Sequence, residues 1–355
     1  SIIVLMLVGT VFVFSPALIL GDIAGDGGRI SIMIWVGVIF LYYLLATLMP
    51  IDKIIGRIYP VFAFALIFMA LALMVCLFVK WPSLPELWDG LGNLGESKGL
   101  LSGQPIFPCL FITIACGAVS GFHATQSPMM ARCLTDERLG RPVFYGAMIT
   151  EGIVALIWAT VSSWFFFDGG AAEVGATVSA AAPDVVVKVS KGWLGVLGGI
   201  LAILGVVAAP ITSGDTAFRS ARLIVADFLH LNQKPVANRL MISIPLFLIA
   251  GVLLWYNIAD ENGFNVIWRY FGWANQTLAV FMLWTATAYL VKFKKGLTYL
   301  ITMIPAAFMT AVCTTYICVA KIGLGLPNSW NRAIGLATFV VSLVVFYILY
   351  FRRRK

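Results

Sequence analysis

The chain has 355 residues, of which 61% are hydrophobic and 11% are charged, and its mean hydropathy is +0.97. Soluble domains carry about 25% charged residues, so the 24 Lys and Arg and 16 Asp and Glu are too few to cover a soluble protein of this length. The formal net charge of +8 is spread over short segments and forms no basic patch interleaved with aromatic residues. Composition therefore excludes a soluble protein and a nucleic-acid partner, and it predicts an all-α integral membrane protein.

Apolar segments long enough to cross a bilayer recur along the whole chain. A helix needs about 20 apolar residues to span a hydrocarbon core of roughly 30 Å. Such segments lie near residues 2–20, 30–49, 58–79, 105–121, 143–166, 193–212, 239–257, 270–291, 297–319 and 333–351. We expect about ten transmembrane helices in a single domain over residues 1–355, with the fourth and sixth helices less regular than the others.

The distribution of basic residues predicts the orientation in the membrane. Cytoplasmic loops carry the excess of Lys and Arg, and the chain ends on Arg352, Arg353, Arg354 and Lys355. With that end inside, alternating loops place about twice as many of the 24 basic residues inside as outside. An even number of helices then puts both visible ends of the chain in the cytoplasm.

A glycine-rich polar stretch interrupts the fourth apolar segment. Residues 117–128 have the sequence GAVSGFHATQSP, and irregular backbone at membrane depth is tolerated only where protein or a water-filled cavity shields it. A broken helix here would expose backbone groups to a solute. The substrate-binding residues would then be Gly121, His123, Thr125, Gln126 and Ser127. The alternative is an ordinary helix end with a capped turn.

A second polar stretch, AAPITSGDT at residues 208–216, lies at the inner end of the sixth segment. Pro210 removes one helix hydrogen bond, and the hydroxyls of Thr212 and Ser213 are hard oxygen donors suited to an alkali cation. Asp215 would add charge or a proton site, which makes these residues candidates for a coupling-ion site. Alternatively, Asp215 pairs with Arg219 four residues later on one face of a helix.

Three further polar residues lie within apolar segments. Glu151 stands almost alone between residues 143 and 166, and at 1.5 Å per residue it lies about 13 Å from Pro142, near the middle of the membrane. An isolated carboxylate there is costly and predicts a functional role, here as a coupling-ion site, although a neutral hydrogen-bonded Glu is the alternative. Asn275 and Gln276 in the eighth segment would line a cavity for the solute or form hydrogen bonds between helices.

Four segments resemble the carbon starvation protein A (CstA) family. They are SGFHATQSPMMARC at 120–133, FYGAMITEG at 144–152, APITSGDTAFRSAR at 209–222 and WRYFGWANQT at 268–277. The resemblance covers nearly the whole chain. It implies an inner-membrane carrier for peptides or pyruvate, used in carbon starvation and grouped with the amino acid, polyamine and organocation transporters.

Carriers of that superfamily have inverted repeats with discontinuous helices at the substrate site. On this likeness the stretch around His123 is the broken helix of the second repeat, and Thr212 with Ser213 resembles a cation-site pair. Family members begin with earlier helices that this chain lacks, so we expect an N-terminally truncated chain. Residues 1–291 would form core-like helices and residues 292–355 two additional C-terminal helices.

These observations predict a secondary active transporter that imports peptides or pyruvate across the bacterial cytoplasmic membrane. A proton or a sodium ion would drive uptake, and no other cofactor is expected. Both solutes, both ions and the oligomeric state are left open by the sequence. A membrane-embedded solute sensor that signals through a partner is the alternative, whereas the absence of a paired catalytic constellation argues against an enzyme.

Overall fold

The computed structural model describes residues 1–24, 28–48, 52–100, 103–178, 182–260, 263–294 and 296–350, and these residues form helices and connecting segments without a strand. The predicted all-α fold class is confirmed. The helices are α1 Ile2–Ala24, α2 Arg29–Leu48, α3 Asp52–Lys80, α4 Leu87–Leu91, α5 Leu94–Ser97, α6 Ile106–Ile114, α7 Phe122–Cys133, α8 Ala147–Phe167, α9 Gly170–Glu173, α10 Ala182–Ala202, α11 Ala208–Phe228, α12 Val236–Ala259, α13 Gly263–Phe293, α14 Leu300–Val319 and α15 Asn331–Tyr350.

Eight helices in the described part of the chain are long and apolar enough to cross a membrane. A ninth span is obtained if Ala182–Leu201 and Ile203–Phe228, which meet at a bend of 55°, count as one broken span. This number is lower than the ten helices expected from the sequence because α13, which covers the eighth predicted segment, is not among them. Helix α13 is 31 residues long, but it is too polar to be counted as a membrane span. Polar residues such as Arg269, Asn275 and Gln276 lower its hydropathy.

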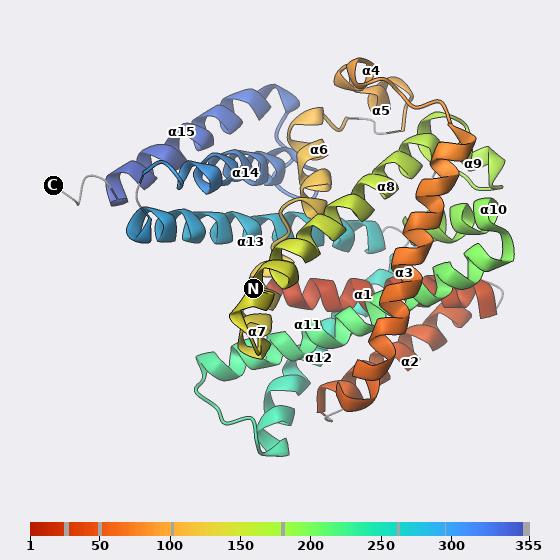
Figure 1. The fold of residues 1–355 in the computed structure, drawn as a ribbon, viewed down its shortest axis with the longest axis horizontal. Helices are drawn as coiled ribbons and strands as arrows, with labels where there is room; N and C mark the ends of the chain where they lie inside the picture. The colour runs from red at the N-terminus through yellow and green to blue at the C-terminus, as the bar shows by residue number, and fades with distance from the viewer. Residues whose placement is uncertain are drawn as a thin grey trace. The chain divides into compact units, whose positions relative to one another are not determined.

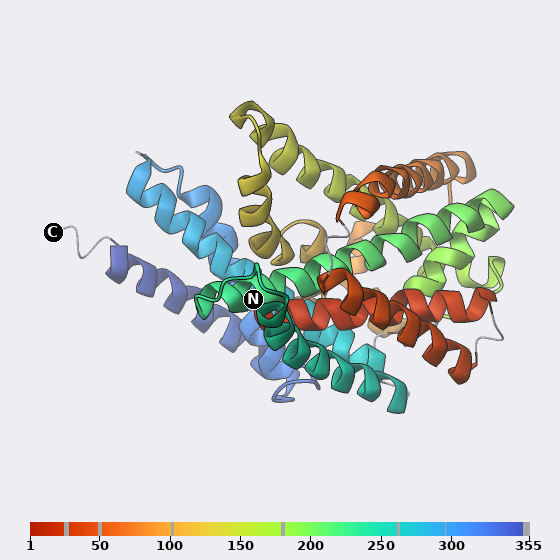
Figure 2. The ribbon, with the colours of Figure 1, turned by 90° about the horizontal axis from the view of Figure 1, so that it is seen from below.

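The chain folds into two compact units. Unit 1 comprises Ser1–Glu86 and Gly152–Trp268, and unit 2 comprises Leu87–Glu151 and Arg269–Lys355. In unit 1, α1 packs against α2, α11 and α12 (Figures 1 and 2). The fully buried Tyr43 of α2 donates its hydroxyl to the carbonyls of Phe12 in α1, at 3.0 Å, and Pro210 in α11, at 2.9 Å. One side chain thereby connects three helices.

Unit 2 is built around α6, α13, α14 and α15. In Figure 1, α14 lies beside α15, and the two helices are in contact. The hydrophobic core of unit 2 includes Ile112, Val280 and Val312, which come from α6, α13 and α14. The indole nitrogen of Trp273 donates to the carbonyl of Cys313 at 3.0 Å and links α13 to α14.

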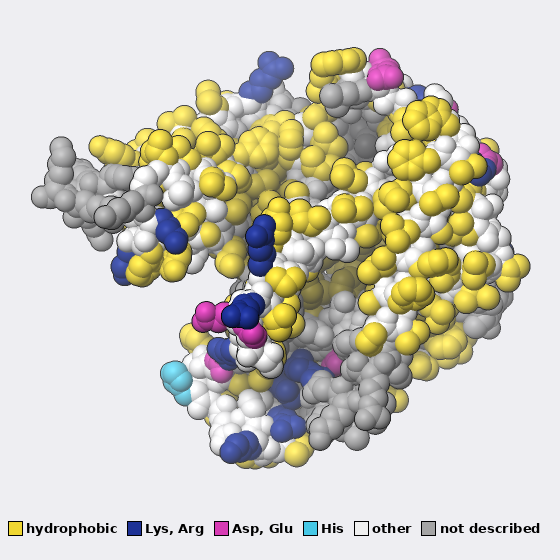
Figure 3. Space-filling model, in the orientation of Figure 1, with side chains coloured by type: hydrophobic (Ala, Val, Ile, Leu, Met, Phe, Trp, Pro, Cys, Tyr) yellow, Lys and Arg dark blue, Asp and Glu magenta, His cyan; other side chains and the backbone are white. Residues whose placement is uncertain are grey.

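Large hydrophobic side chains lie on the outside of many helices. Phe64 in α3 is 70% exposed and Leu336 in α15 is 68% exposed. Figure 3 shows hydrophobic side chains over the visible faces of α3, α14 and α15, with charged side chains in small separate groups. A surface of this kind suits lipid rather than water, and with the apolar helices it makes the chain a multi-pass membrane protein.

Candidate functional site

The fourth predicted helix is broken where the glycine-rich stretch begins. Helix α6 ends at Ile114, a 3₁₀ turn covers Ala115–Gly117, and α7 starts at Phe122. Residues 118–121 between them are not helical. Gly121 lies so close to α13 that a Cβ atom there would overlap the carbonyl oxygen of Asn275. The predicted break is confirmed, and close packing explains the glycine at its end.

Asn275 and Gln276 of α13 bind the broken segment. Both side chains are completely buried. With its amide oriented so that nitrogen faces Val119 and oxygen faces Cys116, Gln276 donates to the carbonyl of Val119 at 2.7 Å and accepts from the N–H of Cys116 at 2.9 Å. Asn275 Nδ2 donates to Ser120 Oγ at 3.1 Å and lies 3.6 Å from Cys116 Sγ. Because buried backbone groups need partners, this arrangement supports the interpretation that these two amides form hydrogen bonds between helices.

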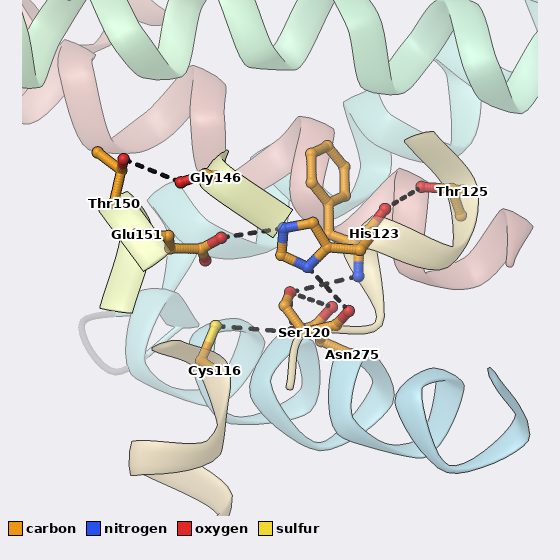
Figure 4. Close-up of polar contacts among 9 residues, drawn as sticks. Cys116, Ser120, His123, Thr125, Gly146, Thr150, Glu151 and Asn275 are labelled. Atoms are coloured by element: carbon orange, nitrogen blue, oxygen red, sulfur yellow. Dashed lines mark hydrogen bonds and ion pairs between the residues drawn. The ribbon is translucent and has the colours of Figure 1, made fainter. Parts of the chain in front are cut away.

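The broken segment places His123 opposite Glu151 (Figure 4). His123 Nε2 lies 2.9 Å from Glu151 Oε2, and His123 Nδ1 lies 3.2 Å from the carbonyl oxygen of Ser120. A carbonyl can only accept, so Nδ1 carries a hydrogen in this contact, and Nε2 faces the carboxylate. The two side chains are 37% and 39% exposed. They can therefore share a hydrogen between Nε2 and Oε2, and neither side chain is fully buried.

The other predicted substrate-binding residues follow His123 in α7. The buried Thr125 donates its hydroxyl to the carbonyl of Phe122 at 2.7 Å. Gln126 Nε2 lies 3.5 Å from Thr125 Oγ1, and Ser127 is partly buried in the same helix. The structure places them within the two turns that follow the break, and whether they contact a solute stays a prediction.

Sequence reasoning assigned no role to Cys116 or Ser120, although both are part of the site. The hydroxyl oxygen of Ser120 accepts hydrogen bonds from Asn275 Nδ2 and from the N–H of Phe122. The backbone carbonyl of Ser120 accepts from His123 Nδ1. The glycine-rich stretch that contains Ser120 was the signal that could have identified it. Among the described residues, no group of three His, Cys, Asp or Glu side chains could hold a metal ion.

The second polar stretch lies in unit 1 and is helical throughout. The backbone is irregular just before this stretch, where a π-helical turn at Ile203–Val207 precedes α11. Pro210 is the third residue of α11, and its ring crowds the carbonyl four residues earlier, at Val206 within this π-helical turn. Thr212 donates its hydroxyl to the carbonyl of Ala209 at 2.9 Å, and Ser213 follows in the same helix.

Asp215 forms an ion pair with Arg219, as the alternative interpretation of the sequence predicted. It is 3% exposed, and its carboxylate oxygens lie 3.0 and 3.3 Å from Arg219 Nη2. Arg219 also approaches the carbonyl of Ala46 at 3.4 Å, and Arg222 donates to the carbonyl of Thr47 at 2.5 Å. Both arginines lie within α11 and bind the last turn of α2.

We expect replacement of Asp215 by Asn to lower the stability of the protein. The change leaves Arg219 partly buried without a full countercharge, and breaking a buried pair in this way costs about 3 kcal/mol. Thermal unfolding in detergent measures the effect, with Asp168→Asn at an exposed position as control. Unchanged stability together with loss of gradient-driven uptake would instead support a coupling role for Asp215.

Comparisons with known proteins agree with the fold and the motifs. The family model described as carbon starvation protein CstA matches residues 1–195 and 168–316. An uncharacterized membrane protein of Haemophilus influenzae is 39% identical over 209 residues, which cover 47% of this chain and 56% of the relative. The peptide transporter CstA of Escherichia coli K12 is 29% identical over 296 residues, with 66% of this chain and 41% of the relative covered.

The pyruvate/proton symporter BtsT of Escherichia coli K12 is 27% identical over 323 residues, which cover 67% of this chain and 43% of the relative. The chain thus spans about half the length, or less, of these three relatives. No solved structure matches it. Since the family model covers well over half of the chain, the resemblance carried by the four sequence motifs is confirmed, and the chain belongs to the carbon starvation protein CstA family.

Proposed function

We propose that the chain is part of a secondary active transporter that imports peptides or pyruvate across the bacterial cytoplasmic membrane together with a proton. The names of the peptide transporter and pyruvate/proton symporter relatives support a carrier. The observation that carries the proposal is the His123–Glu151 pair, whose two members lie in segments long and apolar enough to span a membrane, with His123 just after the non-helical residues 118–121. Ionisable residues within membrane spans mark ion and substrate pathways.

The geometry of the pair supports a simple coupling scheme. With one proton, His123 Nε2 and Glu151 Oε2 form a closed pair. A second proton neutralises Glu151 and leaves the imidazolium of His123 without its countercharge. The imidazolium can then bind the carboxylate that pyruvate and peptides share. Solute and proton would therefore enter together, and the release of both into the cytoplasm would restore the closed pair.

Sodium coupling through Thr212 and Ser213 is the alternative. The hydroxyl of Thr212 donates to its own helix but keeps lone pairs that could bind a cation. The bent span before α11 would be the accompanying irregular segment. This alternative predicts uptake that follows an imposed sodium gradient and is insensitive to an imposed pH gradient.

The proposal is tested by reconstituting the protein at its natural length into liposomes and measuring uptake of labelled pyruvate and of a labelled dipeptide. An inward proton gradient should drive accumulation of at least one of them, and a sodium gradient at constant pH should not. Absence of gradient-driven flux of either solute, with solute-dependent binding of a partner protein, would favour the sensor.

The proposed orientation predicts the accessibility of two loops of unit 1. In a background without the native cysteines, a cysteine at the exposed position 168, after α8, should react with an impermeant thiol reagent added outside cells. A cysteine at the exposed position 234, between α11 and α12, should react only after permeabilisation. The opposite pattern would reverse the topology. The basic residues Lys295, Arg352, Arg353, Arg354 and Lys355 lie outside the described residues.

A further inference from the structure

A groove in unit 2 is separate from the His123–Glu151 site. It lies between α13, α14 and α15 and has a volume of about 540 Å³, within the roughly 300–1,000 Å³ of small-molecule sites. Most of its wall is apolar. The lining residues include Phe281, Trp284, Ala288, Val341, Phe346 and Tyr350.

Five polar side chains in the wall of this groove use their donors within the protein. Trp284 Nε1 donates to Thr310 Oγ1 at 3.0 Å, and Thr310 donates in turn to the carbonyl of Ala306 at 2.7 Å. Thr285, Thr338 and Ser342 likewise donate to carbonyls of their own helices at 2.7–2.8 Å. A polar solute would find few free donors here, whereas a hydrocarbon chain would leave every one of these bonds intact.

One end of the groove is basic. The lining residues Phe281, Trp284, Thr285 and Ala288 form a stripe on α13, and Lys292 continues it one turn later. The C-terminal ends of α13 and α15 point the same way in Figure 1, and Figure 3 shows Lys or Arg side chains at that end of α13. Among the described residues that line the groove, none is Asp or Glu. In the sequence, Arg352, Arg353, Arg354 and Lys355 follow shortly after the lining residue Tyr350.

We propose that this groove binds an acyl chain of an anionic phospholipid whose head group lies at Lys292. The apolar wall accommodates the chain, and the positive charge at its end selects an anionic head group over a zwitterionic one. With the C-terminal end of the chain predicted in the cytoplasm, Lys292 at the C-terminal end of α13 is expected on the same side, which points to lipid of the cytoplasmic leaflet. The proposal does not depend on transport activity.

The test uses quenching of tryptophan fluorescence in bilayers that contain phosphatidylglycerol or phosphatidylethanolamine with brominated acyl chains. Bromine quenches only at short range, and the component due to Trp284 is the difference between the protein and its Trp284→Phe variant. We expect brominated phosphatidylglycerol to quench this component at a several-fold lower mole fraction than brominated phosphatidylethanolamine.

Matched variants separate charge from fold. Lys292→Gln should reduce the preference for phosphatidylglycerol about fivefold, the effect of one basic residue near an anionic surface. Lys321 is exposed and lies beyond the C-terminal end of α14. Lys321→Gln should therefore leave the preference for phosphatidylglycerol unchanged. Ala288→Leu, which fills the groove, should weaken quenching by both lipids. Equal quenching by both lipids in the unmodified protein, or an unchanged preference in Lys292→Gln, would overturn the proposal.

Discussion

Replacing Glu151 by Gln is expected to abolish accumulation of solute above its external concentration while exchange between equal concentrations persists. Gln retains the size of Glu and can hydrogen-bond His123, but it cannot take up or release a proton. Folding should survive, because the hydrogen bond at stake contributes only about 1 kcal/mol. Concentrative uptake and counterflow in proteoliposomes measure the two activities separately.

Two further variants control this experiment. Glu137→Gln, at an exposed position in the same unit, removes one carboxylate away from the pair and should leave uptake unchanged. Glu151→Ala should abolish accumulation as Gln does and should lower thermal stability further, because it also removes the contact with His123. Full concentrative uptake by Glu151→Gln would rule out a coupling role for this residue and would move that role to Asp215.

Gln276→Leu is expected to destabilise the protein. The molecules that still fold are expected to transport the solute more slowly. Leucine fills a similar volume but leaves the carbonyl of Val119 and the N–H of Cys116 buried without partners, at about 1–3 kcal/mol each. The non-helical segment would then lose its attachment to α13, and His123 would no longer be held opposite Glu151. Thermal unfolding and uptake per folded molecule measure these effects.

Thr277→Val provides the matched control, because the Thr277 hydroxyl donates to the carbonyl of Trp273 in its own helix and contacts no backbone group of the broken segment among the described hydrogen bonds. It should change both quantities little. If Gln276→Leu kept normal stability and raised only the KM for the solute, Gln276 would bind solute instead of holding the break.

The sequence was most informative where a local rule determines the structure. Glycines and polar residues at 117–128 interrupt an apolar segment, and the structure breaks the helix at 118–121. His123 was identified from this polar stretch, and Glu151 from its isolated position among apolar residues. Their contact was not predicted, because the pairing of two residues 28 positions apart depends on how the elements on either side of a turn pack together.

Partners on distant helices were beyond local patterns. Asn275 and Gln276 had two interpretations of equal standing, and only the packing of α13 against the break places them on Cys116, Val119 and Ser120. Pro210 correctly indicated disturbed backbone near α11. The disturbance lies before it, at Ile203–Val207, because a proline ring crowds the carbonyl four residues earlier, here that of Val206.

Proton movement that accompanies each solute tests the central claim most directly. In proteoliposomes with a trapped pH-sensitive dye and no imposed gradient, addition of the transported solute outside should acidify the interior in step with solute entry. His123→Gln and Glu151→Gln should each abolish the acidification, and Glu137→Gln should leave it intact. Solute-driven acidification of unchanged size in both pair variants would contradict the assignment of the proton to His123 and Glu151.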